Sequence, residues 1–379
     1  MANRQFLFII LNAIIFNMDN KNSYQAELFF NRLSKNFKIL RKWARKNTIS
    51  CYRLYDRDIP EIPVSLDVFE FLPEKIHNTI QCSEFIKTQN ELISKNDLSA
   101  EKNAEERRYA VLYLYERPYK KEQSEETEWL NLMAKTAAQV LNIPESHIVK
   151  KERKMQKGTN QYEKNSSFQT IRGTVQEQGQ MFKIDLTTYL DTGLFFDHRP
   201  LRKTVRDESE EKRILNLFCY TGSFSVYAAS GNASFVESVD LSNTYLNWAK
   251  ENMRLNGFTN PEKYIFTKED AIKWLKKKSQ TITQNEKFDI IILDPPTFSN
   301  SKSTENVLDI NRDWPDLLEF CVKLLNSNGT LYFSTNSTRL TFDEKKLPKN
   351  TECTDLTSNS IPKDFEGKKP HRLWKIKLY

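Results

Sequence analysis

Three short apolar segments in the second half of the chain each stop abruptly at polar, glycine or proline residues. They are ILNLFCYTGSFS (Ile214–Ser225), SVDLS (Ser238–Ser242) and DIIILDPPTFSNSK (Asp289–Lys302). A buried parallel strand has this pattern where its carboxyl end meets a ligand site. In open α/β sheets, ligands bind outside those ends. Because strand and helix patterns alternate from Leu215 onward, the sequence predicts a doubly wound, mostly parallel α/β domain with a nucleotide-type site.

The length and composition of the chain limit the classes of protein it can be. Its 379 residues allow two or three domains, and a net charge of +7 suits a polyanionic partner without proving one. The five cysteines lie far apart, no C-x-x-C motif occurs, and the four histidines show no metal-ligand spacing. We therefore expect no metal site and a reducing, cytoplasmic location.

The chain begins with an apolar segment. Phe6–Phe16 (FLFIILNAIIF) is too short to span a bilayer, and no small-x-small cleavage site follows it. We expect residues 1–17 to be an extra N-terminal tail, and we expect no membrane association.

Residues 26–47 predict an amphipathic helix. Its apolar residues have the spacing of one helix face, and they are Leu33, Phe37, Leu40 and Ala44. The segment from Arg32 to Lys46 also carries seven cations and no acid. A solvated helix face is one interpretation, but the density of cations favours contact with nucleic-acid phosphates.

The middle of the chain mixes strand, helix and polar patterns. Tyr109–Tyr115 (YAVLYLY) predicts a strand, and Trp129–Leu141 predicts a helix that ends at Asn142-Ile143-Pro144. Alternating segments flank Glu177-Gln178-Gly179 and predict a β-hairpin over 168–175 and 181–187. Polar segments are expected to be loops, and they cover residues 87–107, 119–128 and 351–360.

A second basic run follows the helix in VKKERKMQKGTNQYEK (Val149–Lys164). Together the two runs predict a smaller α+β region that binds RNA, over residues 18–187 and ending in the hairpin, before a Rossmann-like domain at 188–379. The candidate RNA-binding residues are Lys42, Arg45, Lys150, Lys151, Arg153, Lys154 and Lys157.

The turn after the first strand of that domain is suited to a cofactor. Gly222 lets the backbone approach a ligand closely, but one glycine is too few for a dinucleotide fingerprint, so an NAD site is disfavoured. Asp240, at the end of the second strand, can accept hydrogen bonds from ribose hydroxyls. Asp270 sits where a third strand would end and could accept from an adenine amino group. Either aspartate taken alone could equally be a helix N-cap.

The DPPTF segment carries the chemical signature. Pro295 and Pro296 stiffen the loop and remove two N–H donors, so carbonyl groups and the Asp294 carboxylate are left to face the site as acceptors. Phe298 offers a flat face on which a base can stack. These four residues are the predicted catalytic centre.

This order of motifs resembles class I S-adenosylmethionine-dependent methyltransferases. More closely, it is similar to the C-terminal (RlmK) half of the bifunctional 23S rRNA guanine methyltransferases (RlmKL). The similar stretches are Asn31–Glu61, Gln156–Lys164, Tyr189–Arg199 (YLDTGLFFDHR), Leu215–Ala228 (LNLFCYTGSFSVYA), Val239–Gly257, Asp294–Lys302 (DPPTFSNSK), Asn311–Asp313, Phe333–Phe342 (FSTNSTRLTF) and His371–Trp374. The resemblance implies methyl transfer from S-adenosyl-L-methionine to N7 of a guanine in 23S rRNA or a pre-ribosomal particle.

The resemblance also assigns Tyr189–Arg199 to the cofactor site. Gly193 would permit close approach, Phe195 or Phe196 would pack against the adenosyl group, and Arg199 would bond the methionine carboxylate. His198 is a candidate base, but a structural role is expected because the implied reaction requires no base. The expected cofactor residues are Gly193, Phe196, Asp197, Arg199, Phe218, Tyr220, Thr221, Gly222, Ser223, Asp240, Leu241, Asp270, Ala271 and Asp294.

The position of the cysteines bears on the chemistry. Methylation at C5 of a pyrimidine needs a cysteine nucleophile, and the loops DPPTFSNSK and FSTNSTR contain none. Cys219 lies in the cofactor turn and Cys321 in an expected helix, so attack by a nitrogen is favoured. Two alternatives stay open, which are methylation of an exocyclic amino group of guanine or adenine and a non-catalytic role in ribosome assembly. The THUMP-bearing half of the bifunctional enzymes has no counterpart in this sequence, so a separate protein carrying it is an expected partner.

Overall fold

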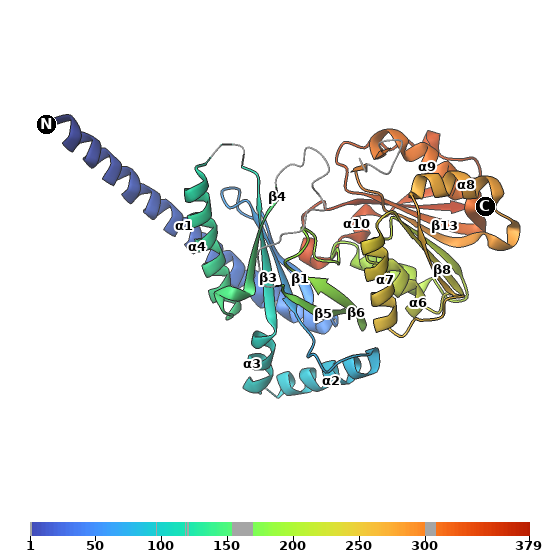
Figure 1. Ribbon diagram of the computed structural model, residues 1–379, viewed down its shortest axis with the longest axis horizontal. Helices are drawn as coiled ribbons and strands as arrows, with labels where there is room; N and C mark the ends of the chain where they lie inside the picture. The colour runs from blue at the N-terminus through green and yellow to red at the C-terminus, as the bar shows by residue number, and fades with distance from the viewer. Residues whose placement is uncertain (1, 96, 118, 120, 154–169, 300–307) are drawn as a thin grey trace. The chain divides into compact units, whose positions relative to one another are not determined.

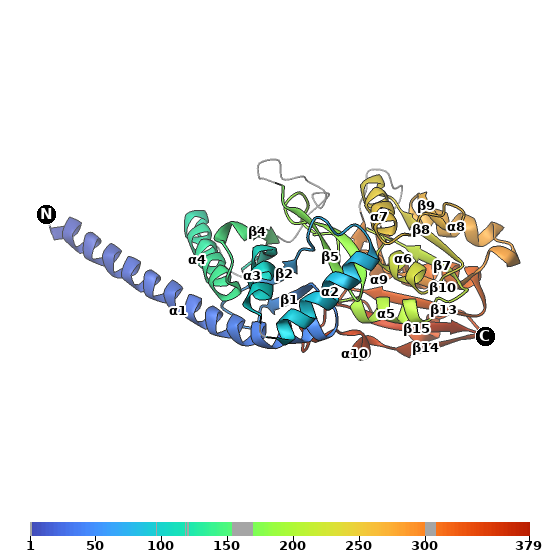
Figure 2. The ribbon, with the colours of Figure 1, turned by 90° about the horizontal axis from the view of Figure 1, so that it is seen from below.

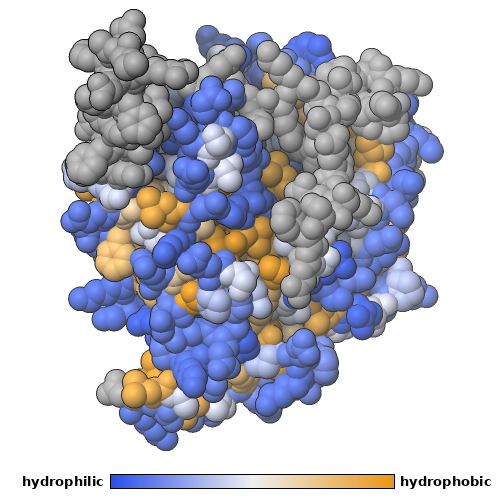
Figure 3. Space-filling model, turned by 60° about the vertical axis from the view of Figure 1, so that its left-hand side comes forward, coloured by the Kyte–Doolittle hydropathy of each residue, from blue (hydrophilic) through white to orange (hydrophobic). Residues whose placement is uncertain are grey.

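The computed structural model describes residues 2–95, 97–117, 119, 121–153, 170–299 and 308–379. These form two compact units, one of Met1–Pro73 with Ile86–Met155 and one of Glu74–Phe85 with Gln156–Tyr379. Among the described residues, no helix is long and apolar enough to cross a membrane. On the face drawn in Figure 3, hydrophilic residues cover most of the surface, and hydrophobic residues show only in patches between them.

The first unit is built on a four-stranded sheet with the order β1-β2-β3-β4. β1 and β2 pair antiparallel, as do β2 and β3, whereas β4 runs parallel to β3. Helix α4 is the crossover between those two parallel strands, and it packs against α1 (Figure 1). The elements are α1 (Ala2–Lys46), β1 (Cys51–Asp56), β2 (Val64–Glu70), α2 (Thr79–Ser94), α3 (Leu98–Glu106), β3 (Arg108–Tyr115), α4 (Gln123–Leu141) and β4 (Ile148–Arg153), and the first residues of α2, up to Phe85, belong to the second unit.

The predicted amphipathic stripe of α1 is confirmed as the face that packs into the core. Leu33 and Ala44 are fully buried there, and Phe37 is partly buried. The helix begins much earlier than residue 26, because no proline or glycine interrupts the chain between Ala2 and Lys46. Helix α4 ends as predicted at Leu141, where Asn142 adopts a left-handed conformation.

Two segments expected to be loops are helical. Residues 87–107 contain the second half of α2 and all of α3, and Asp97 caps α3 by accepting from the Ser99 N–H at 2.8 Å. Residues 119–128 contain the first turns of α4, which begins at Gln123 with acids that favour a helix N-terminus. Helices α2 and α3 bury few side chains, so their apolar faces are too narrow to stand out from the charged background.

The second unit contains a seven-stranded sheet with the order β14-β15-β13-β10-β7-β8-β9. The five strands from β13 to β9 are parallel, and β15 runs antiparallel to both of its neighbours. Figure 2 shows β14, β15 and β13 side by side in that order. The doubly wound, mostly parallel α/β domain predicted from the sequence is therefore confirmed.

Helices cover both faces of this sheet. Side chains of α8 and α9 pack on one face with Leu215, and side chains of α5 and α6 pack on the other with Ile214. The elements are α5 (Arg199–Asp207), β7 (Arg213–Leu217), α6 (Ser223–Ser230), β8 (Phe235–Asp240), α7 (Asn243–Leu255), β9 (Tyr264–Lys268), α8 (Ala271–Thr281), β10 (Phe288–Leu293), β11 (Phe298–Ser299), β12 (Leu308–Asp309), α9 (Ile310–Leu324), β13 (Leu325–Thr335), β14 (Thr351–Asp355), α10 (Thr357–Ser360) and β15 (Arg372–Leu378). Among the described residues, the second unit also has short 3-10 helices at Gln284–Glu286, Glu344–Lys346 and Lys363–Phe365, and the first unit has one at Glu145–His147.

Residues 351–360, expected to be a loop, form β14 and α10 instead. β14 is an edge strand, and it pairs only with β15. Most of its side chains are exposed or half-buried, so its sequence lacks the apolar alternation that identifies a strand.

The predicted hairpin is present as β5 (Arg172–Glu177) and β6 (Gln180–Asp185), joined by Gln178 and Gly179 with positive φ angles. The sequence placed it at the end of the N-terminal region, but it belongs to the second unit. The reason is its contact with α7, where the Asn256 carboxamide accepts from the Met181 N–H at 2.8 Å and donates to the Met181 carbonyl at 2.7 Å.

Candidate active site

The carboxyl ends of β7, β8 and β10 lie together at one edge of the parallel sheet. In the strand register, Leu217 pairs with Val239 on one side and with Leu293 on the other. The residues that follow these three strands therefore emerge side by side, and they include Asp240 and Asp294. This arrangement brings together the strand ends that the sequence singled out.

The turn after β7 is held in a strained shape by the end of β8. Phe218 and Tyr220 both have positive φ angles, which are uncommon outside glycine. The Tyr220 N–H donates to Oδ2 of Asp240 at 3.0 Å, and the Ser242 N–H donates to Oδ1 at 2.8 Å. Burial raises the pKa of Asp240, and these N–H donors oppose that rise. Each carboxylate oxygen keeps a lone pair for a further donor.

Two glycines are required at this edge. Gly222 has a φ of +73°, and a Cβ there would lie 2.8 Å from the Cβ of Ala249. Gly193 has a φ of +107°, and a Cβ there would lie 2.3 Å from the Trp248 ring. The Thr221 hydroxyl donates to the Gly193 carbonyl at 2.6 Å, so the 189–199 segment and the β7 turn are joined directly. The cofactor residues predicted around this junction are Phe218, Tyr220, Thr221, Gly222, Ser223, Asp240 and Leu241.

One aromatic residue of the 189–199 segment is suited to pack on a ligand. Phe195 is 44% exposed, and its ring lies 5.2 Å from that of Tyr220. Phe196, which the sequence analysis selected, is only 4% exposed. The structure therefore favours Phe195 over Phe196 as the exposed ring beside the cofactor turn. The sequence could not predict which of these two adjacent rings is exposed, because the segment has no regular secondary structure.

Asp270 occupies the N-cap of α8. Its Oδ1 accepts from the N–H groups of Ile272 at 2.8 Å and Lys273 at 3.1 Å. The capping interpretation, left open in the sequence analysis, is thus present in the structure, and Ala271 after it is buried. The same side chain has a second carboxylate oxygen, so the two roles are chemically compatible.

Arg199 is committed to a buried ion-pair network. Its guanidinium donates to Glu177 at 2.7 Å and to Asp364 at 2.9 Å, and its side chain is fully enclosed. Arg202 binds the same glutamate at 2.8 Å. Burial opposes ionisation of Glu177, but Arg202 and Arg199 outweigh burial and lower its pKa. This placement favours a structural role for Arg199 over the predicted bond to a methionine carboxylate.

The Asp294 loop is fastened to the end of β13. The Ser334 hydroxyl donates to Oδ1 of Asp294, and the Thr297 hydroxyl donates to Oδ1 of Asn336 at 2.5 Å. Phe298 is 58% exposed, as a stacking platform requires. Pro295 is buried and Pro296 half-buried, so the prolines lie under the loop surface. Ser334 and Asn336 were not selected as site residues from the sequence, although the FSTNSTR segment was noted for its lack of cysteine and for its resemblance to the family.

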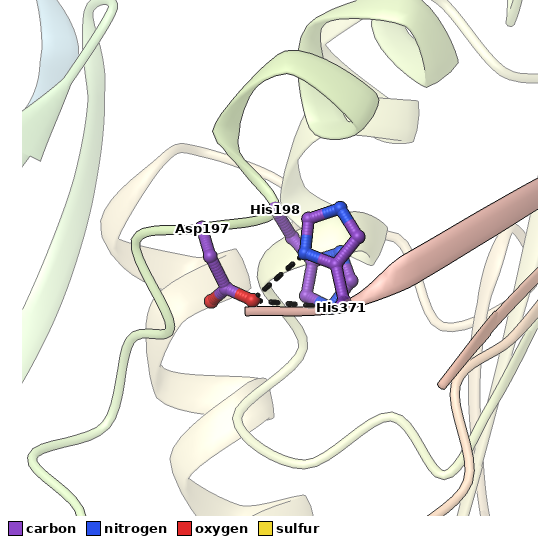
Figure 4. Close-up of side chains that lie close together, drawn as sticks. All are labelled: Asp197, His198 and His371. Atoms are coloured by element: carbon purple, nitrogen blue, oxygen red, sulfur yellow. Dashed lines mark hydrogen bonds and ion pairs between the residues drawn. The ribbon is translucent and has the colours of Figure 1, made fainter. Parts of the chain in front are cut away.

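A compact group of ionisable side chains lies behind Asp294. Nε2 of His198 is 3.3 Å from Oδ2 of Asp294 and 3.8 Å from Oδ2 of Asp197. Nδ1 of His371 is 2.9 Å from the same Asp197 oxygen (Figure 4). Asp197, a predicted cofactor residue, therefore faces these two histidines, and its interactions with them lower its pKa although burial raises it. His371 was not selected from the sequence because its partners lie far away in the chain.

Neither cysteine near the edge of the sheet has the environment of a nucleophile. Cys219 and Cys321 are both buried, and burial raises the pKa of each thiol. A thiol with a raised pKa carries little thiolate at neutral pH. This agrees with the expectation that the reaction proceeds without a cysteine.

The predicted RNA-binding residues differ in their surroundings. Lys42 is exposed, whereas Arg45 pairs with Glu101 at 2.6 Å. Lys150 is exposed and donates to Asn131, and Lys151 is buried above the ring of Tyr113. Arg153 also lies over that ring, 4.6 Å from its centroid. Lys154 and Lys157 lie outside the described residues.

The exposed cations in the Arg32–Lys46 run of α1 form one stripe. Lys35, Lys38, Lys42 and Lys46 are spaced three, four and four residues apart, so they project from one face of the helix. The arginines of the same run are instead paired, since Arg41 binds Glu101 at 2.5 Å. We call these four lysines the α1 lysine stripe.

Comparisons with known proteins agree with this fold. The family of S-adenosylmethionine-dependent methyltransferases matches residues 106–350. The structure of SMU.776, described as a methyltransferase complexed with SAH, matches 93% of this chain and 82% of its own, with a TM-score of 0.65 and 19% identity. At that identity the likeness shows the fold alone.

Curated relatives are much closer in sequence. Ribosomal RNA large subunit methyltransferase K of Neisseria meningitidis serogroup B is 39% identical over 349 residues, which are 92% of this chain and 86% of the relative. Ribosomal RNA large subunit methyltransferase K/L of Magnetococcus marinus is 38% identical over 353 residues. That match covers 93% of this chain but only 43% of the relative, so the chain spans less than half the length of the K/L protein.

Proposed function

The chain belongs to the S-adenosylmethionine-dependent methyltransferase family, and we propose that it methylates N7 of a guanine in 23S rRNA. S-adenosylmethionine is the methyl donor of this family. Two relatives of similar sequence are named as ribosomal RNA large subunit methyltransferases, which supports an rRNA substrate. The observation that carries the proposal is the Asp294 loop, which holds both a carboxylate bound by Ser334 and the exposed ring of Phe298.

The residues around the β7 turn are proposed to hold the cofactor. Asp240 lies where ribose hydroxyls can donate to its remaining lone pairs, and its partners Tyr220 and Ser242 fix the carboxylate in advance. Phe195 and Tyr220 offer neighbouring ring faces for the adenosyl group. Gly193 and Gly222 keep side chains out of the place where the backbone approaches the ligand.

Attack by guanine N7 needs neither a base nor a nucleophilic side chain. The N7 lone pair would attack the methyl carbon while the carbon–sulfur bond breaks and sulfur leaves as a neutral thioether, so no proton has to leave. Catalysis is then mostly alignment of donor and acceptor, which can supply roughly 7–11 kcal/mol of the barrier. Positive charge moves from the sulfonium to the purine ring, and the Asp294 carboxylate would stabilise that charge in the transition state. The target base has to be unstacked first, at a cost of a few kcal/mol.

We assign RNA docking to the first unit, with the α1 lysine stripe as its phosphate contact. These four lysine side chains are exposed, whereas Glu101 pairs with Arg41 and Arg45. Lysine is suited to such contacts because phosphate binding depends on charge rather than on base identity.

An exocyclic amino group is the second candidate target. The Asp294 carboxylate, held by Ser334, can accept a hydrogen bond from an amino group. It can equally attract a purine ring that carries positive charge. Nucleoside mass spectrometry of RNA methylated by the purified protein separates the two. We expect 7-methylguanosine, whereas a methylated amino group would replace the N7 proposal.

The reaction should be run on naked 23S rRNA and on large-subunit precursor particles. A separate THUMP-bearing protein stays part of the proposal, and activity of the chain alone on naked RNA would make it unnecessary. Calorimetric titration with S-adenosylmethionine separates an enzyme from an assembly factor. Absence of cofactor binding would contradict the enzymatic assignment itself.

A further inference from the structure

The carboxylate of Asp294 is contacted from two sides. Ser334, at the end of β13, donates to Oδ1. Nε2 of His198, the residue that precedes α5, lies 3.3 Å from Oδ2. His198 is buried, so its ring is not a surface group that happens to lie near the site. Methyl transfer to N7 requires no base, so the contact between His198 and Asp294 must have another role.

The surroundings of His198 select one tautomer of its ring. Burial lowers the pKa of His198 although Asp294 and Asp197 oppose this, so the ring is neutral at pH 7 and carries one N–H. Nε2 faces carboxylate oxygens of both aspartates, at 3.3 and 3.8 Å. No hydrogen-bond partner approaches its buried Nδ1 within the part of the chain that the structure describes. If the proton were on Nδ1, that N–H would have no acceptor, and the lone pair of Nε2 would face two carboxylates. The proton is therefore assigned to Nε2.

The ring of His198 is held in place by a second histidine. His371 stacks on it, with ring centroids 4.3 Å apart and an interplanar angle of 19°. The orientation of His371 is itself fixed, because Nδ1 lies 2.9 Å from Asp197 and Nε2 lies 2.8 Å from the Ser360 hydroxyl. Figure 4 shows the two rings packed together beside the Asp197 carboxylate.

The same three residues have the composition of a metal site. Ligand atoms of Asp197, His198 and His371 lie within 4.8 Å of one another. A metal ion bound by two imidazoles lies close to the plane of each ring, along the nitrogen lone pair. Two rings that stack nearly parallel at 4.3 Å share no such point. The geometry therefore fits a hydrogen-bonded group better than a metal centre.

We propose that His198 is a positioning residue, which donates its Nε2–H to Asp294 and fixes the direction in which that carboxylate faces the target base. Asp197 and His371 act one step further away, by clamping the His198 ring. This rests on the proposed methyl transfer to a purine, because it assigns Asp294 the task of stabilising charge that appears during transfer. With Ser334 bound to Oδ1 and Nε2 of His198 only 3.3 Å from Oδ2, the two side chains together would orient the carboxylate before the substrate arrives.

Matched substitutions separate the hydrogen bond from the packing. His198→Phe keeps a flat ring for the stack on His371 but has no donor, and His198→Gln keeps an amide N–H at a similar distance from the backbone. We expect His198→Phe to lower the single-turnover rate at saturating cofactor and RNA by about 10- to 100-fold, the range for a slightly misplaced catalytic group. His198→Gln should recover most of that loss, and cofactor affinity should stay the same in both variants.

A double-mutant cycle gives the decisive result. If His198 acts through Asp294, then His198→Phe should change the rate little in the background of Asp294→Asn. An equal loss in both backgrounds, or a fully active His198→Phe protein, would overturn the proposal.

Nitrogen NMR of the imidazoles tests the same bond without any reaction. The protein has four histidines, and the signals of His198 are those lost in the His198→Phe protein, or in His198→Gln should the first not fold. We expect ¹⁵N shifts of a neutral Nε2–H ring, changed by Asp294→Asn. The Nδ1–H tautomer would refute the proposal. Absence of methyl transfer with the expected NMR result would instead count against the proposed function alone.

Discussion

The main-chain N–H of Tyr220 donates to Oδ2 of Asp240 at 3.0 Å, and this bond joins the turn after β7 to the end of β8. The carboxylate is thus oriented toward the turn by the protein itself. A ligand that donates to Asp240 would therefore use the lone pairs that the Tyr220 N–H does not occupy.

Asp240→Ala should weaken S-adenosylmethionine binding by about 1.5–3 kcal/mol, since it removes an ionised acceptor from two hydroxyl donors. Isothermal titration calorimetry measures the change. Asp289→Ala, on the opposite end of the sheet, is the control for a general effect of losing a carboxylate. Equal affinity of wild type and Asp240→Ala would remove Asp240 from the cofactor site.

Asp294→Asn and Phe298→Ala should affect the bound base rather than the free cofactor. The asparagine keeps the size of the side chain without its charge, so it should slow transfer while cofactor affinity stays the same. Phe298→Ala should weaken RNA binding by about 1–3 kcal/mol through lost stacking. Single-turnover rates and RNA titrations report the two effects. An Asp294→Asn protein as fast as wild type would show that the catalytic centre lies elsewhere.

Cys219→Ser and Cys321→Ala should both keep substantial methyltransferase activity, because attack by a ring nitrogen needs no thiol. Alanine is chosen at the second position because Cys321 is fully buried in α9, where a hydroxyl would lack a partner. Denaturing gel electrophoresis with radiolabelled RNA would reveal a covalent adduct. An adduct that either substitution abolishes would point to carbon methylation of a pyrimidine.

Lys38→Glu with Lys42→Glu should weaken RNA binding and flatten its dependence on salt. The two residues belong to the α1 lysine stripe, and each phosphate contact contributes about 0.7–0.9 to the logarithmic salt slope. The matched control is Lys276→Glu with Lys277→Glu, an exposed pair on α8. Equal slopes for both double variants would mean that the stripe is only a solvated helix face.

Glu177→Gln should destabilise the second unit by about 3–5 kcal/mol at pH 7, because two guanidinium groups would lose their buried partner. The sign of the pH effect follows from the lowered pKa of Glu177. The folded state binds its proton less readily than the unfolded chain, so the stabilisation is present above the unfolded pKa and is lost as pH falls through the folded one. Denaturant unfolding at pH 7 and pH 4 should therefore show a smaller difference between wild type and variant at pH 4. If the difference in unfolding free energy were the same at both pH values, Glu177 would not be ionised in the folded protein.

The edge of the sheet that carries the site could be predicted because its signal is local. An apolar run followed at once by Asp240 or Asp294 needs no knowledge of the rest of the chain. The partners of those residues are not local. Ser334 is 40 residues from Asp294. Asp364 is 165 residues from Arg199.

This distance explains why the ion pairs of Arg199 could not be predicted from the sequence. An arginine next to a cofactor-like segment suggests an anion ligand, and nothing nearby in sequence reveals that two carboxylates already occupy it. The same holds for His371, whose contact with Asp197 spans 174 residues. Periodicity predicts which face of an element is buried, but pairing between distant polar groups becomes visible only in three dimensions.

The contact between β6 and α7 has a consequence for the behaviour of the protein in a crowded solution. The outward edge of β6 would expose main-chain donors and acceptors, and such an edge can recruit a strand from another molecule. Asn256 binds both main-chain groups of Met181, Asn252 accepts from the Lys183 N–H at 2.9 Å, and Trp248 donates to the Lys183 carbonyl at 3.0 Å. Three side chains of a helix thus stand in for a neighbouring strand, and a two-stranded ribbon can lie at the surface without inviting aggregation.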